Sequence, residues 1–95
     1  MTLLVLSLGS NVEPKVNIKL AVESLRKKFG ELLLSSVYES EAVGFEGNNF
    51  LNLVTSGESD ASLEEVQNYL KMLEDDMGRV RDKPKFSDRP IDIDI

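Results

Sequence analysis

Two aspartates near the end of the printed sequence have the residue type and spacing of a metal site. Residues 89–95 read Arg-Pro-Ile-Asp-Ile-Asp-Ile, so Asp92 and Asp94 are two residues apart. On an extended strand this spacing places both carboxylates on one face and the isoleucines on the other. Adjacent carboxylates repel each other unless a cation lies between them. Mg2+ suits such a pair because it takes few protein carboxylates and fills its other positions with water and phosphate oxygens. An acidic, solvent-exposed strand face is the alternative interpretation.

The segment before these aspartates is basic. Residues 79–95 carry 5 basic and 4 acidic side chains, whereas residues 1–78 carry 6 basic and 13 acidic ones. Arg79 and Arg81 are again two residues apart, and Lys85 and Arg89 follow them. Guanidinium groups bind phosphate oxygens in fork geometry, and arginines beside magnesium-binding carboxylates are components that phosphoryl transfer requires. The combination favours a phosphate site, with surface salt bridges between these charges as the alternative.

The composition restricts the chemistry further. The chain has no cysteine and no histidine, which excludes disulfides, thiolate ligands and histidine acid–base chemistry. A metal site must therefore consist of oxygen ligands, which favours magnesium, calcium or manganese over zinc. The net charge of −6 argues against general nucleic-acid binding. No apolar run approaches the roughly 20 residues that cross a bilayer, and the first residues lack the basic leader of a signal peptide. We therefore expect a cytoplasmic protein.

The length of 95 residues predicts a single domain, 1–95, that contains both helices and strands. Apolar periodicity predicts strands at 2–8, 31–39, 50–56 and 91–95, the last with its three isoleucines in the core. One helix is expected to begin at Pro14 and end before Gly30, and another to follow the capping box that begins at Ser62 and to end at Gly78. Loops are expected at 40–49 and 79–88. The order βαββαβ with right-handed crossovers predicts an α+β, ferredoxin-like sandwich, with two helices on one face of an antiparallel sheet.

Two further groups of residues could bind a ligand. Gly9-Ser10-Asn11 could hold an anion, but it lacks the glycine spacing and the lysine of a P-loop, so a strand-to-helix turn is favoured. Phe50 and Asn52 alternate on the third expected strand, where they could stack on and hydrogen-bond a flat heterocycle. Phe50 as an ordinary core residue is the alternative.

From Leu6 to Ile95 the chain resembles the 6-hydroxymethyl-7,8-dihydropterin pyrophosphokinases (HPPK) of folate biosynthesis, a family with a ferredoxin-like fold. The resemblance is most specific in two motifs, Gly78-Arg79-Val80-Arg81 and Arg89-Pro90-Ile91-Asp92-Ile93-Asp94-Ile95. It also includes Leu8-Gly9-Ser10-Asn11, Ser36-Val37-Tyr38-Glu39 with Gly44, Asn49-Phe50-Leu51-Asn52, Leu63-Glu64-Glu65 and Glu74.

The resemblance implies transfer of pyrophosphate from ATP to the hydroxymethyl oxygen of the pterin, with release of AMP. Asp92 and Asp94 would hold two Mg2+ ions, and the expected partners are ATP and the pterin, bound by a monomer without nucleic acid or membrane. The catalytic set implied is Arg79, Arg81, Arg89, Asp92 and Asp94. The ATP-binding set implied is Gln67, Lys71, Glu74, Arg79, Arg81, Lys85, Arg89 and Ile95. The pterin-binding set implied is Ser40, Glu41, Val43, Phe50 and Asn52.

The chain departs from the family pattern in three places. Phe86-Ser87-Asp88 replaces a frequent Trp-Gly-Pro, and Lys71 stands where a glutamine is usual. Family members also continue past the last strand, with a segment that supplies a histidine and an arginine near ATP and an aromatic residue over the pterin. A second hypothesis is therefore a truncated or shortened, non-catalytic ferredoxin-like module that binds nucleotide, pterin or a partner chain.

Overall fold

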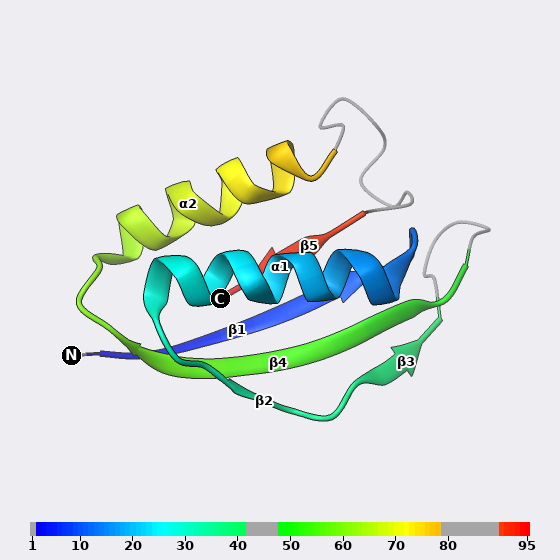
Figure 1. Cartoon of the computed structure of the whole chain (residues 1–95), viewed down its shortest axis with the longest axis horizontal. Helices are drawn as coiled ribbons and strands as arrows, with labels where there is room; N and C mark the ends of the chain where they lie inside the picture. Colours follow the sequence, from blue (N-terminus) through cyan, green and yellow to red (C-terminus); the bar gives the residue numbers. More distant parts are fainter. Residues whose placement is uncertain (1, 42–47, 79–89) are drawn as a thin grey trace.

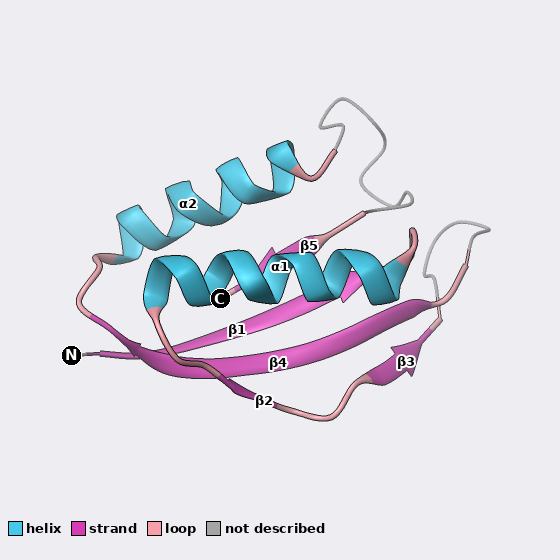
Figure 2. Cartoon of the chain, in the orientation of Figure 1, coloured by secondary structure: helices cyan, strands magenta, loops and turns pink. Residues whose placement is uncertain are grey.

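The computed structural model describes residues 2–41, 48–78 and 90–95. Figures 1 and 2 show two helices above a sheet whose strands run along the length of the molecule. The elements in chain order are β1 (Thr2–Ser10), α1 (Pro14–Phe29), β2 (Leu33–Leu34), β3 (Tyr38–Ser40), β4 (Phe50–Ser59), α2 (Leu63–Asp76) and β5 (Asp92–Asp94).

The described strands form one five-stranded sheet in the order β2-β4-β1-β5, with β3 also paired to β4. Every pair is antiparallel. Both helices lie on the same face of this sheet (Figure 1). The structure therefore confirms the predicted α+β fold with an antiparallel sheet. When β2 and β3 are counted as one interrupted strand, the strand order agrees with the ferredoxin-like arrangement.

The core lies between the sheet and the two helices. Alternate residues of β1 (Leu4, Leu6 and Leu8) point into it, as the period of two requires. A tyrosine on α2 joins the helices: the Tyr69 hydroxyl donates to the backbone oxygen of Ser24 on α1 at 3.1 Å. Its ring also meets Phe29 edge to face, with centroids 5.5 Å apart. The two helices consequently form one layer over the sheet.

The predicted helix boundaries are confirmed by local backbone geometry. Pro14 is the first residue of α1, and Gly30 follows the helix with a φ of 87°. The Ser62 side chain accepts from the Glu65 backbone N–H and the Glu65 carboxylate accepts from Ser62, which completes the capping box. Gly78, at a φ of 96°, lies just past α2. Within the described residues neither helix has the length and apolar character needed to cross a bilayer.

The second predicted strand, 31–39, is wrong as a continuous element. Leu34 faces Thr55 and Tyr38 faces Asn52, so four steps along this edge match three steps along β4. One extra residue produces a bulge and shifts the register. Ser35 occupies the interruption: its N–H donates to the Val54 oxygen at 2.8 Å, and its hydroxyl, not its carbonyl, accepts from the Val54 N–H at 2.9 Å.

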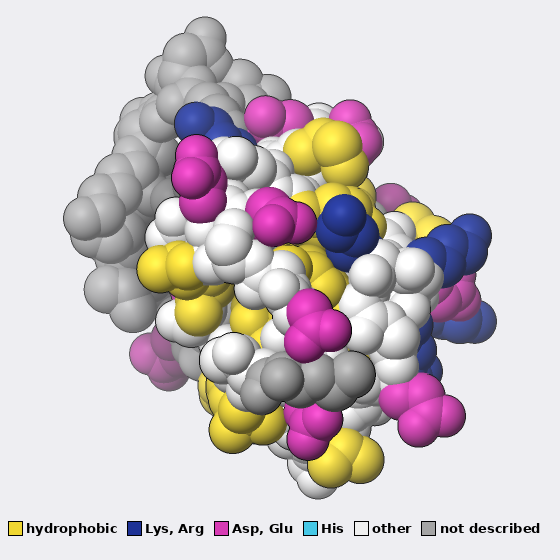
Figure 3. Space-filling model, turned by 90° about the vertical axis from the view of Figure 1, so that its left-hand side faces the viewer, with side chains coloured by type: hydrophobic (Ala, Val, Ile, Leu, Met, Phe, Trp, Pro, Cys, Tyr) yellow, Lys and Arg dark blue, Asp and Glu magenta, His cyan; other side chains and the backbone are white. Residues whose placement is uncertain are grey.

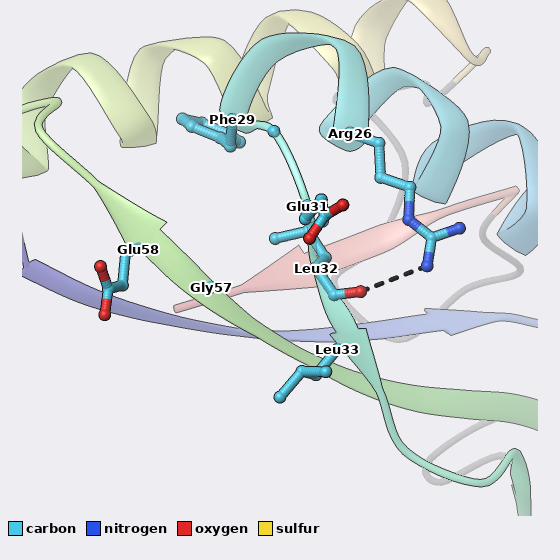
Figure 4. Close-up of a pocket in the computed structure, with 8 residues that line it drawn as sticks. Arg26, Phe29, Glu31, Leu32, Leu33, Gly57 and Glu58 are labelled. Atoms are coloured by element: carbon cyan, nitrogen blue, oxygen red, sulfur yellow. Dashed lines mark hydrogen bonds between the residues drawn. The ribbon is translucent and has the colours of Figure 1, made fainter.

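The third strand extends past its predicted end near Gly57 and finishes at Ser59. A Cβ at Gly57 would lie 2.7 Å from Leu32 Cδ2 and 2.9 Å from the Glu31 oxygen, so this glycine permits close approach of residues 31–32 and not a turn. Arg26 Nη2 donates to the Leu32 oxygen at 3.2 Å, which attaches the end of α1 to the same segment (Figure 4).

The last strand is shorter than predicted. Ile91 and Ile93 are buried, as expected, but Ile95 is 56% exposed, so its predicted place in the core is wrong. The cause is that pairing with β1 stops at Asp94, opposite Ser7.

Charge is distributed unevenly over the surface shown in Figure 3. Acidic side chains are spread over the visible face, whereas most of the visible Lys and Arg side chains gather toward one side.

Candidate active site

One row of paired residues crosses the sheet at Gly9. Gly9 on β1 pairs with Asn52 on β4 and with Asp92 on β5. Asn52 in turn pairs with Tyr38 on β3. Directly paired residues of antiparallel strands place their side chains on the same face. The row therefore brings together a residue expected to bind pterin and a residue expected to bind metal.

This row faces away from the helices. In the adjacent row, Leu8 pairs with Leu53 on one side and with Ile93 on the other, and all three residues are buried in the core. Because successive side chains of a strand alternate between faces, Asn52 and Asp92 point to the opposite side of the sheet. They lie on strands separated only by β1, and two interstrand spacings amount to about 10 Å. That separation suits two substrates that must react with each other.

The half of the site on β3 and β4 is held by side-chain hydrogen bonds. Asn52 Nδ2 donates to Ser40 Oγ at 2.8 Å and to the Tyr38 oxygen at 3.2 Å. A Cβ at Gly9 would lie 3.2 Å from Asn52 Oδ1 and 3.6 Å from Phe50 Cδ1, so the glycine leaves room for both side chains. Phe50 is half-buried and does not belong to the core cluster, so the alternative of an ordinary core residue is wrong, and its stacking on a ligand stays a prediction.

Hydrogen bonds from two asparagine side chains link the ends of these strands to neighbouring segments. Asn49 Nδ2 donates to the Glu39 carboxylate at 2.6 Å, linking the start of β4 to β3. Asn11, which is buried, donates from Nδ2 to the Asn48 oxygen at 3.3 Å. Glu41 is exposed just after β3. Val43, the remaining residue of the predicted pterin set, lies outside the described residues.

The half of the site on β5 is positioned by the core beneath it. Asp92 is half-buried and Asp94 is exposed, while Ile91 and Ile93 are buried on the other face. Glu74 on α2 is only 5% exposed, and its Oε2 accepts from the Ile93 N–H at 2.9 Å. Among the described strands β5 pairs with β1 alone, so this carboxylate satisfies a donor on the other edge of β5.

The residues predicted to bind ATP are only partly covered by the structure. Gln67 and Lys71 are exposed on α2, and with Glu74 they follow the i, i+4, i+7 spacing of a single helix stripe. Ile95 lies in a small cleft of about 140 Å3 that also includes Leu3 and Leu63. Four further predicted residues lie outside the described part of the chain, namely Arg79, Arg81, Lys85 and Arg89.

The donor atoms present fit magnesium. Within residues 2–41, 48–78 and 90–95 no group of three or more acidic side chains is placed to hold a metal ion. The candidate metal site consists of the two carboxylates of Asp92 and Asp94. Two carboxylates are few for a calcium site, which takes six to eight oxygen ligands. They suit Mg2+, which completes its octahedron with water and substrate phosphates.

The structure gives two residues, Gly9 and Glu74, supporting roles that the sequence did not predict. Gly9-Ser10-Asn11 was expected to form a turn, yet Gly9 and Ser10 belong to β1 and only Asn11 lies beyond it. An isolated glycine inside an apolar strand marks close approach of another group, and that signal was available. The bond from the Ile93 N–H to Glu74 has no local signal, because nothing in the spacing of α2 indicates which polar group its carboxylate will meet.

The family model for 7,8-dihydro-6-hydroxymethylpterin-pyrophosphokinase (HPPK) matches residues 5–95. The chain belongs to this family. An HPPK of Aquifex aeolicus, named 2-amino-4-hydroxy-6-hydroxymethyldihydropteridine pyrophosphokinase, is 38% identical over all of this chain and 60% of its own length. A folate synthesis bifunctional protein of Arabidopsis thaliana is 34% identical over 96% of this chain and 19% of its own length. The chain thus spans less than two thirds of the length of either relative.

Proposed function

We propose that this chain binds magnesium–ATP and 6-hydroxymethyl-7,8-dihydropterin and transfers pyrophosphate from the nucleotide to the pterin, yielding AMP and the pterin diphosphate. The observation that carries the proposal is the pairing of Gly9 with both Asn52 and Asp92. This pairing puts a residue suited to a heterocycle beside one suited to a metal–phosphate complex. Membership of the HPPK family supports the same substrates.

The pterin is proposed to lie against Phe50, with its ring edge at Asn52. The Asn52 amide nitrogen already donates to Tyr38 and Ser40. Its oxygen Oδ1, directed toward Gly9, is therefore the atom that accepts a hydrogen bond from a ring N–H. The Ser40 and Glu41 segment and Val43 complete the proposed pterin site.

Asp92 and Asp94 are proposed to hold the magnesium ions. Bound Mg2+ neutralises developing charge on the phosphate oxygens. The pterin hydroxymethyl oxygen attacks the β-phosphorus of ATP, the bond from that phosphorus to the α,β-bridging oxygen breaks, and the hydroxyl proton passes to solvent. Arg79, Arg81, Lys85 and Arg89 are proposed to bind phosphate, and Gln67, Lys71, Glu74 and Ile95 to lie near the nucleoside. Positioning and charge compensation dominate such transfers, which suits a chain without histidine.

The proposal is tested by thermal unfolding with Mg2+ and a nonhydrolysable ATP analogue. Binding to the folded state raises Tm, and about 100-fold excess over Kd stabilises by about 2.7 kcal/mol. Asp94→Ala should abolish the magnesium-dependent rise, whereas Asp60→Ala, on the connection between β4 and α2, should retain it. An equal rise in Asp94→Ala would contradict the metal assignment. AMP formation from ATP and the hydroxymethyl-dihydropterin then tests the transfer itself.

A second candidate function is binding of nucleotide or pterin without turnover. It predicts the magnesium-dependent rise in Tm with no AMP formed, whereas the first candidate predicts both. The chain is proposed to act as a cytoplasmic monomer that binds neither nucleic acid nor membrane, which sedimentation at varied protein concentration tests for the monomer.

A further inference from the structure

A groove of about 510 Å3 lies between α1 and the edge of the sheet at the bulge. It is on the helix face of the sheet, opposite the Gly9 row. Leu51 and Leu53 line the groove, while Asn52 between them points to the other face. The groove is therefore a cavity separate from the candidate active site, on the other side of β4.

The floor and outer wall of the groove are apolar. Ile18 and Val22 of α1 and Leu53 of β4 are buried members of the core that form the floor. On the outer wall, Leu34 is 43% exposed and Val37 is 54% exposed. The bulge at 35–37 interrupts the edge strand between these two residues, which leaves their apolar side chains beside the groove. An apolar ligand would remove the exposed wall residues Leu34 and Val37 from water.

The rim of the groove on α1 is cationic. Lys15 and Lys19 are one helical turn apart, Arg26 lies farther along, and Glu23 is the one acidic lining residue. Three cations and one carboxylate leave a charge of +2, in a chain whose net charge is −6. Arg26 is also held in place, because its Nη2 donates to the Leu32 oxygen (Figure 4). The local charge is thus opposite in sign to that of the protein as a whole.

We propose that this groove binds a small aliphatic carboxylate, with its chain on Ile18, Val22 and Val37 and its carboxylate at the lysine end of the rim, between Lys15 and Lys19. The volume lies within the range of about 300–1,000 Å3 that is common for small-molecule sites. An apolar body with a single anionic end matches both the apolar floor and the cationic rim. A neutral apolar molecule would satisfy only the floor, and inorganic phosphate would satisfy only the rim.

The test uses decanoate as the probe and decanol as the neutral molecule of equal chain length, titrated into the full 95-residue chain and followed by calorimetry. Decanoate should bind with about fivefold higher affinity than decanol, because an exposed ion pair adds up to about 1 kcal/mol. Lys19→Glu reverses one rim charge and should weaken decanoate about tenfold. Lys27→Glu makes the same charge change on an exposed residue of α1 that does not line the groove, and should change the affinity less than about twofold.

A second variant tests the apolar outer wall independently of charge on α1. Val37→Ser shortens an exposed side chain of the wall and should weaken both probes by a similar factor. Equal binding of decanoate and decanol, or equal losses in Lys19→Glu and Lys27→Glu, would overturn the proposal. An absence of decanoate binding would also overturn it. Each result leaves the pyrophosphokinase proposal intact, because none of these residues belongs to the candidate active site.

Discussion

The two halves of the candidate active site differ in how firmly the fold holds them. β4 has ten residues and pairs with β1 on one side and with β2 and β3 on the other. β5 has three residues, and its described strand pairing is with β1 alone. Asn52 is held by hydrogen bonds to Tyr38 and Ser40, whereas the segment around Asp92 depends on buried isoleucines and on Glu74.

The difference fits the ligands proposed for each half. A flat heterocycle is recognised by shape and by directed hydrogen bonds, which require side chains held before the ligand arrives. Carboxylates that bind Mg2+ are drawn together by the cation itself, so their strand needs less support beforehand. We therefore expect variants of the β5 half to affect nucleotide binding and stability, and variants of the β4 half to affect pterin binding.

The largest effect is expected from Glu74→Met, which keeps the side-chain bulk but leaves the Ile93 N–H without this acceptor. A buried donor that loses its partner costs about 2 kcal/mol, so Tm should fall by about 10 °C. Magnesium–nucleotide affinity should fall as well, because β5 frays and because Glu74 is itself proposed to lie near the nucleoside, while pterin affinity stays unchanged. Thermal unfolding and calorimetry measure these quantities. Asn68→Met, an exposed position on α2, serves as the control. An equal loss of pterin affinity would show that the two halves are not independent.

Gly9→Ala should act on the β4 half. The new Cβ would lie 3.2 Å from Asn52 Oδ1, so the amide must move by a few tenths of an ångström. Since Oδ1 is the proposed hydrogen-bond acceptor for the pterin, the affinity of the protein for the pterin should fall about tenfold, with little change in stability. Ser7→Ala lies on the same face of β1, two residues away, and should bind pterin as the parent does. Titration of the pterin into both variants measures the effect, and unchanged binding in Gly9→Ala would exclude the proposed contact.

A smaller effect is expected from Thr55→Val. Thr55 is 1% exposed on β4, and its hydroxyl has no hydrogen-bond partner within the described residues. Replacing an unsatisfied buried hydroxyl by a methyl group of similar shape should raise the free energy of unfolding by about 1 kcal/mol. Denaturant unfolding measures the change, and Thr55→Ser, which keeps the hydroxyl, should not stabilise. A loss of stability in Thr55→Val would mean that β4 depends on this hydroxyl.

The smallest effect concerns pH and the contact between the helices. Burial, and secondarily the Asp76 carboxylate, raise the pKa of Tyr69 above 10.0. The unfolded chain then loses the phenolic proton at lower pH than the folded one, so it binds fewer protons. The free energy of unfolding should therefore be unaffected below pH 10 and fall as pH rises from there to the folded-state pKa. The difference between parent and Tyr69→Phe, followed by denaturant unfolding, isolates this tyrosine. A difference independent of pH would contradict the shift.

Elements with local signals were predicted well from the sequence. The proline at the start of α1, the capping box at Ser62 and the glycines at 30 and 78 act within one helical turn, so their effects can be read without the fold. The core faces of β1 and α2 follow from periodicity alone. The errors lie where distant segments meet. The bulge after Leu34, the extension of β4 through Gly57 and the exposure of Ile95 each depend on pairing with another strand.

The sequence by itself determined the chemistry that is possible here. Without cysteine or histidine, any metal site must use oxygen ligands, and the spacing of Asp92 and Asp94 places two carboxylates on one face of a strand. Tertiary structure decided that Asp92 lies in one row with Asn52, on the same face of the sheet and with only β1 between them. The adjacency exists because Gly9 pairs with both neighbouring strands, and such pairing depends on where the whole chain packs its apolar faces. The same packing gave Gly9 its role, since room for Asn52 and Phe50 is defined only once three strands lie together.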